Sequence, residues 1–186
     1  MKKFIPNIVL ISILFISSFV KITRAKTVDP VTKNSYRSEI QSGGFICLVN
    51  RFMDEPWSGG TYAIRIFKEN LDNLVTAHIS SRDGSIEEVY FSDVDKDKML
   101  ELIVFTRSAG SGGYGNIDFY KLVEDTLIQE EFPLPIDDGY RGHDQISIKN
   151  GKLIRSYPIY KKGDSNVSPS GGSKTLEYNF TKKTWE

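Results

Sequence analysis

The feature that most constrains the fold is a long succession of short apolar segments separated by turn residues. Residues 45–50 form a continuous apolar run. In residues 62–67, Tyr62, Ile64 and Ile66 alternate with Ala63, Arg65 and Phe67. Such runs, rich in β-branched and aromatic residues, are typical of strands, and none keeps a helical period for three turns. The strands predicted in this way are 45–50, 62–67, 74–80, 86–91, 100–106, 115–123, 126–132, 146–149, 152–157 and 175–185, the last with a turn near 181–183.

Two dipeptides between these runs carry turn signals. Asp83-Gly84 and Asn150-Gly151 have the composition of two-residue hairpin turns, in which both central residues adopt positive φ. Repeated short strands joined by such turns favour an antiparallel all-β fold over a helical or α/β one. We therefore predict one antiparallel β-sandwich domain over residues 43–186.

The N-terminus has the three parts of a secretory signal peptide. Lys2 and Lys3 precede an apolar run over residues 4–20, and small or short side chains follow at Thr23 and Ala25. We expect cleavage after Ala25, which defines residues 1–25 as the signal peptide. The alternative is an uncleaved membrane anchor, which a run of this length nearly spans. The polar residues 26–42 are predicted to be a flexible leader, and the mature protein is expected to have no stable membrane anchor.

Charge and cysteine content exclude several classes of protein. Cleavage removes four of the 24 basic residues and none of the 24 acidic ones, so the mature chain has a net charge of −4. An acidic chain without a basic run argues against nucleic acid as a partner. One cysteine and two histidines exclude a disulfide scaffold and a zinc finger. The single thiol, Cys47, lies in an apolar run and is expected to be buried.

An acidic stretch at residues 93–101 is the first candidate site. Its carboxylates are spaced like the ligands of a calcium loop, in which oxygens converge on a hard cation. Lys96 stands where such loops usually have glycine, and Lys98 adds a second positive charge. The alternative is a structural turn, whose side-chain oxygens accept hydrogen bonds from local amides. The candidate ligands are Asp93, Asp95, Asp97 and Glu101.

A glycine-rich stretch at residues 108–115 is the second candidate site. It lies between two predicted strands, and neither a following Lys-Ser/Thr nor a helix supports a phosphate-binding loop. It is either a flexible hairpin or a thin loop, almost free of side chains, that presents the hydroxyls of Ser111 and Tyr114. A thin loop of this kind can enter a narrow cleft. The candidate binding residues are Ser111, Gly112, Gly113 and Tyr114.

Two further polar stretches, 139–144 and 160–173, are predicted to be surface loops. The first contains His143, but no serine or cysteine in a recognisable nucleophile context accompanies it. We therefore expect no enzymatic activity and no cofactor other than the calcium left open above.

The order of these motifs resembles the bacterial periplasmic inhibitors of invertebrate-type lysozyme. The resemblance rests on the acidic turn running into Glu-Leu-Ile-Val-Phe at 101–105, followed by Ser-Gly-Gly-Tyr-Gly at 111–115. It continues through Gly-His-Asp at 142–144, the run 157–166 and Gly-Gly at 171–172, and so covers residues 43–180. The sequence departs from the family at Lys96 and Lys98, which puts a bound calcium in doubt.

The resemblance implies a β-sandwich that blocks a lysozyme by inserting a serine- and tyrosine-bearing loop into its active site. On this chain those positions are Ser111 and Tyr114, the partner is an invertebrate-type lysozyme and the compartment is the periplasm. The alternative is a calcium-dependent secreted module that binds carbohydrate or mediates adhesion. The oligomeric state is left open between a monomer and a homodimer.

Overall fold

The computed structural model describes residues 37–134 and 136–186. The predicted signal peptide and residues 26–36 of the predicted leader lie outside this part, so the cleavage site after Ala25 stays a prediction. Among the described residues, no helix is long and apolar enough to cross a membrane.

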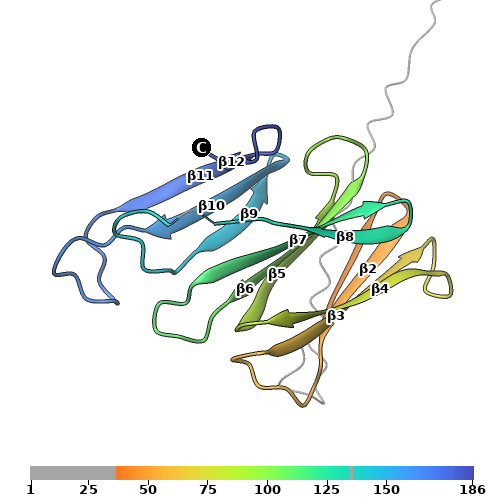
Figure 1. Cartoon of the computed structure of the whole chain (residues 1–186), viewed down its shortest axis with the longest axis horizontal. Coiled ribbons are helices and arrows are strands. Elements are labelled where there is room, and N and C mark those ends of the chain that lie inside the picture. Colours follow the sequence, from red (N-terminus) through yellow and green to blue (C-terminus); the bar gives the residue numbers. More distant parts are fainter. Residues whose placement is uncertain (1–36, 135) are drawn as a thin grey trace, which may run out of the picture.

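The described chain forms three antiparallel four-stranded sheets (Figure 1). The first contains β1 (Arg37–Ser42), β2 (Phe45–Arg51), β3 (Gly60–Lys68) and β4 (Leu74–Arg82). The second contains β5 (Ser85–Ser92), β6 (Leu100–Arg107), β7 (Gly115–Val123) and β8 (Thr126–Glu130). The third contains β9 (Gln145–Lys149), β10 (Lys152–Pro158), β11 (Ser173–Asn179) and β12 (Thr184–Trp185). The predicted all-β, antiparallel fold class is confirmed.

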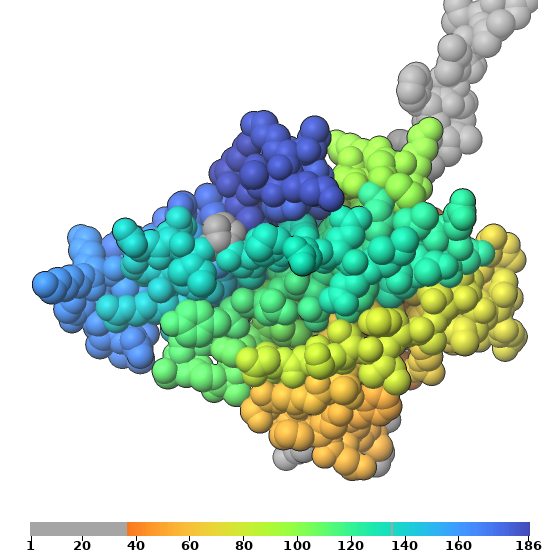
Figure 2. All heavy atoms as spheres, viewed as in Figure 1, coloured from red at the N-terminus to blue at the C-terminus, as the bar shows by residue number. Residues whose placement is uncertain are grey.

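The second sheet is the middle layer of the molecule and is covered on both faces. One face packs on the first sheet through a shared apolar core that includes Val49, Ile64, Leu102 and Val104. The other face packs on the third sheet through a core that includes Phe105. In the space-filling view, green and teal atoms of the middle sheet separate the orange and yellow atoms of the first sheet from the blue third sheet (Figure 2).

The structure has three stacked sheets, whereas the predicted β-sandwich has two. The cause is visible in β6, where Leu102 and Val104 point into the first core while Ile103 and Phe105 point into the second. A strand buried on both faces has a continuous apolar sequence, whereas a strand with one wet face alternates. Periodicity alone identifies β6 as buried but does not reveal what covers each of its faces.

The predicted leader 26–42 is wrong for its last six residues, which form β1. This strand pairs along its whole length with β2, from Arg37 opposite Asn50 to Ser42 opposite Phe45. The turn between them is Gly43-Gly44, with φ of 57° and 80°. Ile40 is the one large apolar side chain of β1, and it is buried in the first core. Cys47, opposite Ile40, is buried as predicted.

One of the two predicted hairpin turns is confirmed and the other is wrong. Asn150 and Gly151 have φ of 53° and 72° and join the paired strands β9 and β10. Asp83-Gly84 instead crosses from the first sheet to the second, because β5 pairs with β6 and not with β4. Gly84 has a φ of 104°, and a Cβ there would lie 1.8 Å from the carbonyl oxygen of Arg107. Residue 84 must be glycine because its backbone lies so close to Arg107 at the end of β6 that no side chain fits.

We predict that alanine at either of two adjacent positions of β6 destabilises the fold. Leu102→Ala and Ile103→Ala should each lower the free energy of unfolding by about 2–5 kcal/mol, because each leaves a cavity in a different core. Denaturant unfolding measures both changes. Ile79→Ala, on the exposed side of β4 at 63% exposure, is the control and should change stability by less than about 0.5 kcal/mol. A negligible effect of Ile103→Ala would contradict the three-layer arrangement.

Candidate functional site

The glycine-rich loop 108–115 connects β6 to β7 and closes on itself through local hydrogen bonds. Ser108 N donates to Tyr114 O at 2.9 Å, and Tyr114 N donates to Ser108 Oγ at 3.0 Å. Within this closure, Gly113 N donates to Gly110 O at 2.9 Å. These three hydrogen bonds define the shape of the loop in the structure.

The four predicted binding residues of this loop divide into two kinds. Ser111 and Tyr114 are exposed, Tyr114 by 47%, whereas Gly112 and Gly113 are buried. A Cβ at Gly112 would lie 2.5 Å from the Tyr114 ring and 2.8 Å from Arg141 O. The glycines thus allow the backbone to pack inward, and the two hydroxyl-bearing side chains face solvent.

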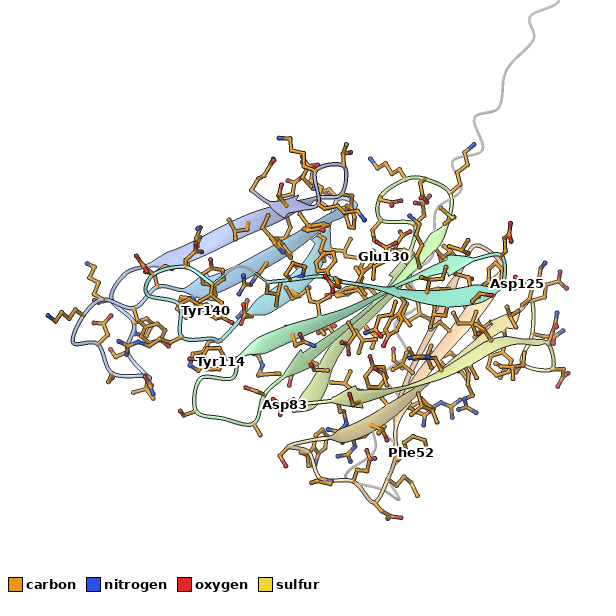
Figure 3. The ribbon with its side chains drawn as sticks, in the orientation of Figure 1. Phe52, Asp83, Tyr114, Asp125, Glu130 and Tyr140 are labelled. Carbon is orange, nitrogen blue, oxygen red and sulfur yellow. The ribbon has the colours of Figure 1, made fainter. Side chains whose placement is uncertain are left out.

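The loop rests on the segment 139–144, which precedes β9. The Tyr114 and Tyr140 rings meet edge to face, with centroids 5.5 Å apart (Figure 3). Asp144 is fully buried, and its Oδ2 accepts a hydrogen bond of 2.9 Å from Gly115 N. The contact of Asp144 with the loop joins residues 29 positions apart, so the sequence does not predict it.

The acidic stretch forms a tight turn between β5 and β6. Asp93 Oδ2 accepts a hydrogen bond from Lys98 N at 3.1 Å, Asp95 Oδ1 one from Asp97 N at 3.1 Å, and Asp97 Oδ1 one from Met99 N at 2.9 Å. Lys96 and Lys98 adopt positive φ of 66° and 74°. These are the local bonds that a structural turn predicts.

The structure brings three of the four predicted calcium ligands together, but a lysine lies among the carboxylates. One oxygen each from Asp93, Asp95 and Glu101 lies within 4.8 Å of the others. Lys121 Nζ lies 2.8 Å from Asp95 Oδ2, 2.5 Å from Asp97 Oδ2 and 3.4 Å from Glu101 Oε1. A calcium ion at this place would have to displace the ammonium group. Lys121 was not identified from the sequence, because it lies on β7.

The pKa values at this turn reflect the competition between burial and the ion pairs. Burial, opposed by the hydrogen bond from Val94 N, raises the pKa of Glu101 to about 7. Burial also disfavours the charged form of Lys121, but hydrogen bonds with Asp95 and Asp97 raise the pKa of its ammonium above the ordinary value. The ammonium group of Lys121 thus stabilises this cluster of carboxylates.

The two candidate sites lie at opposite ends of β6, since the acidic turn precedes this strand and the glycine-rich loop follows it (Figure 1). An eight-residue strand separates them by about 26 Å at about 3.3 Å per residue. A small ligand bound at one site therefore does not contact the other.

We expect Asp97→Ala to lower the free energy of unfolding by about 1 kcal/mol, because it removes the acceptor of the Met99 amide. Urea denaturation measures the change. Asp72→Ala, which removes an exposed carboxylate in the β3–β4 connection, is the control and should leave the midpoint unchanged. Equal midpoints for Asp97→Ala and the unaltered chain would contradict the structural role of the turn.

Calcium should leave the melting temperature unchanged, because the Lys121 ammonium already lies against the carboxylates that would bind it. The measurement is thermal unfolding in calcium and in chelator, with magnesium at equal ionic strength as the control. A calcium-specific rise in melting temperature would overturn this expectation and favour the calcium-dependent module.

A family model identifies the family to which most of this chain is related. A sequence model described as "Periplasmic lysozyme inhibitor of I-type lysozyme" (PliI) matches residues 34–134, more than half of the chain. The crystal structure of PliI-Ah from Aeromonas hydrophila is 32% identical, covering 50% of this chain and 84% of that one, with a TM-score of 0.47. The structure of A. hydrophila PliI with Meretrix lusoria lysozyme is 35% identical, covering 47% of this chain and 74% of that one, with a TM-score of 0.43. The comparison with curated proteins found no match.

The family match is shorter than the expected resemblance at its C-terminal end. It includes the first two sheets, the acidic turn and the loop 108–115, and it stops at residue 134, before the third sheet. The expectation that the resemblance reaches residue 180 is therefore not supported by this match. Over residues 34–134, the chain belongs to the family of periplasmic lysozyme inhibitors of I-type lysozyme.

Proposed function

We propose that this protein inhibits an invertebrate-type lysozyme in the periplasm by inserting the loop 108–115 into the active-site cleft. The observation that carries the proposal is the family match, which includes this loop and names both the target and the compartment. The family consists of inhibitors, which act by binding a protein partner and not as enzymes.

The shape of the loop supports this role. Gly112 and Gly113 pack inward, while Ser111 and Tyr114 extend from the same turn into solvent. A cleft that binds one polysaccharide chain admits a loop of this width more readily than one with bulky side chains on both sides. Two hydrogen bonds between Ser108 and Tyr114, one of them to the Ser108 hydroxyl, also hold the loop before binding, which lowers the entropic cost of association.

The chemistry of the two side chains fits the target. Glycosidases generally hydrolyse their substrates with a pair of carboxyl groups that flank the scissile bond. Hydroxyl groups donate hydrogen bonds to carboxylates, and charge-assisted bonds of this kind are stronger than neutral ones. The Tyr114 ring adds apolar area that becomes buried on binding. Because the loop presents no electrophile, it would block the cleft without forming a covalent bond.

Net charge contributes to the encounter. The mature chain expected from cleavage after Ala25 carries a net charge of −4. An acidic inhibitor approaching a basic enzyme associates faster, and the effect decreases with added salt. This electrostatic attraction changes the association rate more than it changes the affinity.

Tyr114→Ala is expected to weaken inhibition by roughly thirtyfold, and Ser111→Ala by less. Truncation of a central interface residue costs at least about 2 kcal/mol, and about 1.4 kcal/mol corresponds to tenfold in affinity. Tyr114 should matter more because its ring contributes area in addition to the hydroxyl group. The measurement is inhibition of an invertebrate-type lysozyme, such as that of Meretrix lusoria, together with the melting temperature of each variant.

The matched control is Ile128→Ala on β8, which removes an apolar side chain of nearly the same exposure, 46%. It should retain full inhibition. The proposal fails if Ser111→Ala, Tyr114→Ala and the double variant all inhibit as the unaltered chain does.

A further inference from the structure

The segment 139–144 is in direct backbone contact with the glycine-rich loop. His143 N donates hydrogen bonds to Gly112 O at 2.8 Å and to Gly113 O at 3.2 Å. Gly142 has a φ of 88°, and a Cβ at this position would lie 2.1 Å from Gly112 O. The two backbones can approach this closely only because residue 142 has no side chain.

Asp144 ties the end of the loop to the same segment. Its Oδ2 accepts hydrogen bonds from Gly115 N, at 2.9 Å, and from the Tyr140 hydroxyl. Its backbone oxygen accepts a bond of 2.6 Å from Arg107, whose side chain also donates to Gly113 O at 3.3 Å. The last residue of β6 and the first residue of β7 are thus both bonded to Asp144.

Arg155 anchors Asp144 to the third sheet. Its Nε donates to Asp144 Oδ1 at 2.7 Å, and both side chains are fully buried. Arg155 lies on β10, where its guanidinium group stacks over the Tyr140 and Tyr157 rings at 5.0 and 4.4 Å. Separating the two buried charges would leave each uncompensated, which is strongly destabilising. The ion pair therefore holds Asp144, and with it the segment 139–144, against β10.

These contacts come from residues beyond 134, where the family match ends. We propose that the third sheet and the segment 139–144 brace the inhibitory loop, with Gly142, Asp144 and Arg155 as positioning residues that act through Gly112, Gly113 and Gly115. The loop contains four glycines between residues 110 and 115, and such a chain loses much conformational entropy when it is fixed. If the free protein holds the loop in its binding shape only part of the time, the apparent affinity for the lysozyme is reduced to that fraction of its full value. Contacts that brace the loop keep the binding shape dominant and so preserve the affinity.

The inference rests on the proposed function, and the test separates the two. Gly142→Ala pushes a methyl group into Gly112 O and should weaken inhibition of an invertebrate-type lysozyme at least about tenfold, which corresponds to about 1.4 kcal/mol. Gly151→Ala is the matched control, because Gly151 also has positive φ, 72°, but has nothing within 4 Å of an added Cβ. It should inhibit as the unaltered chain does.

A double variant distinguishes positioning from a general loss of structure. If Gly142 acts through the loop, Gly142→Ala should add little to the effect of Tyr114→Ala, since coupled residues are not additive. Equal losses in both backgrounds, or full inhibition by a folded Gly142→Ala variant, would overturn the brace. Full inhibition by Ser111→Ala, Tyr114→Ala and their double variant would instead overturn the proposed function.

A milder pair of variants decides the question if Gly142→Ala does not fold. Tyr140 and Tyr157 both stack on Arg155, and each donates its hydroxyl to a carboxylate, Asp144 for Tyr140 and Asp137 for Tyr157. Tyr140→Phe should weaken inhibition several-fold, whereas Tyr157→Phe, which also loses one hydrogen bond to a carboxylate and therefore controls for the lost stability, should not. Equal inhibition by the two variants would overturn the brace.

Discussion

Burial of both faces of β6 is the constraint on which the rest of the molecule depends. Its side chains alternate between two separate cores, so the strand cannot shift by one residue without exchanging every contact on both sides. Because the register of β6 is fixed, the positions of its first and last residues are fixed as well. The acidic turn before β6 and the glycine-rich loop after it are therefore set at defined positions, about the length of the strand apart.

The two ends of β6 satisfy buried polar groups in different ways. At the beginning of the strand, the Glu101 carboxylate is buried and pairs with Lys121 from β7. At the other end, Asp144 is buried and pairs with Arg155 from β10. The first arrangement lies within the middle sheet, whereas the second crosses to the third sheet. Only the second therefore makes the geometry of a candidate binding loop depend on the C-terminal part of the chain.

Most of the strands could be predicted from the sequence, because each is marked by a local apolar pattern and a turn. β1 could not, since its sequence is polar except for Ile40, and its identity depends on pairing with β2. Asp83-Gly84 has the composition of a hairpin turn but joins two sheets, and no local signal distinguishes these cases. In the candidate site, the binding role of Ser111 and Tyr114 is predicted from the motif and stays a prediction. The contributions of Lys121 and Asp144 could not, because they depend on contacts between residues distant in sequence.

The hydrogen bonds of Gly112 and Gly113 also bear on how the protein survives outside the cytoplasm. Exposed loop tips rich in small residues are preferred sites of proteolytic cleavage. A protease needs the backbone to open locally, and cleavage follows the population of the open form when closing is fast. Because His143 and Arg107 bind the carbonyl groups of these glycines, the loop can be exposed without being open. We therefore expect the contacts that define the shape of the loop also to slow its digestion.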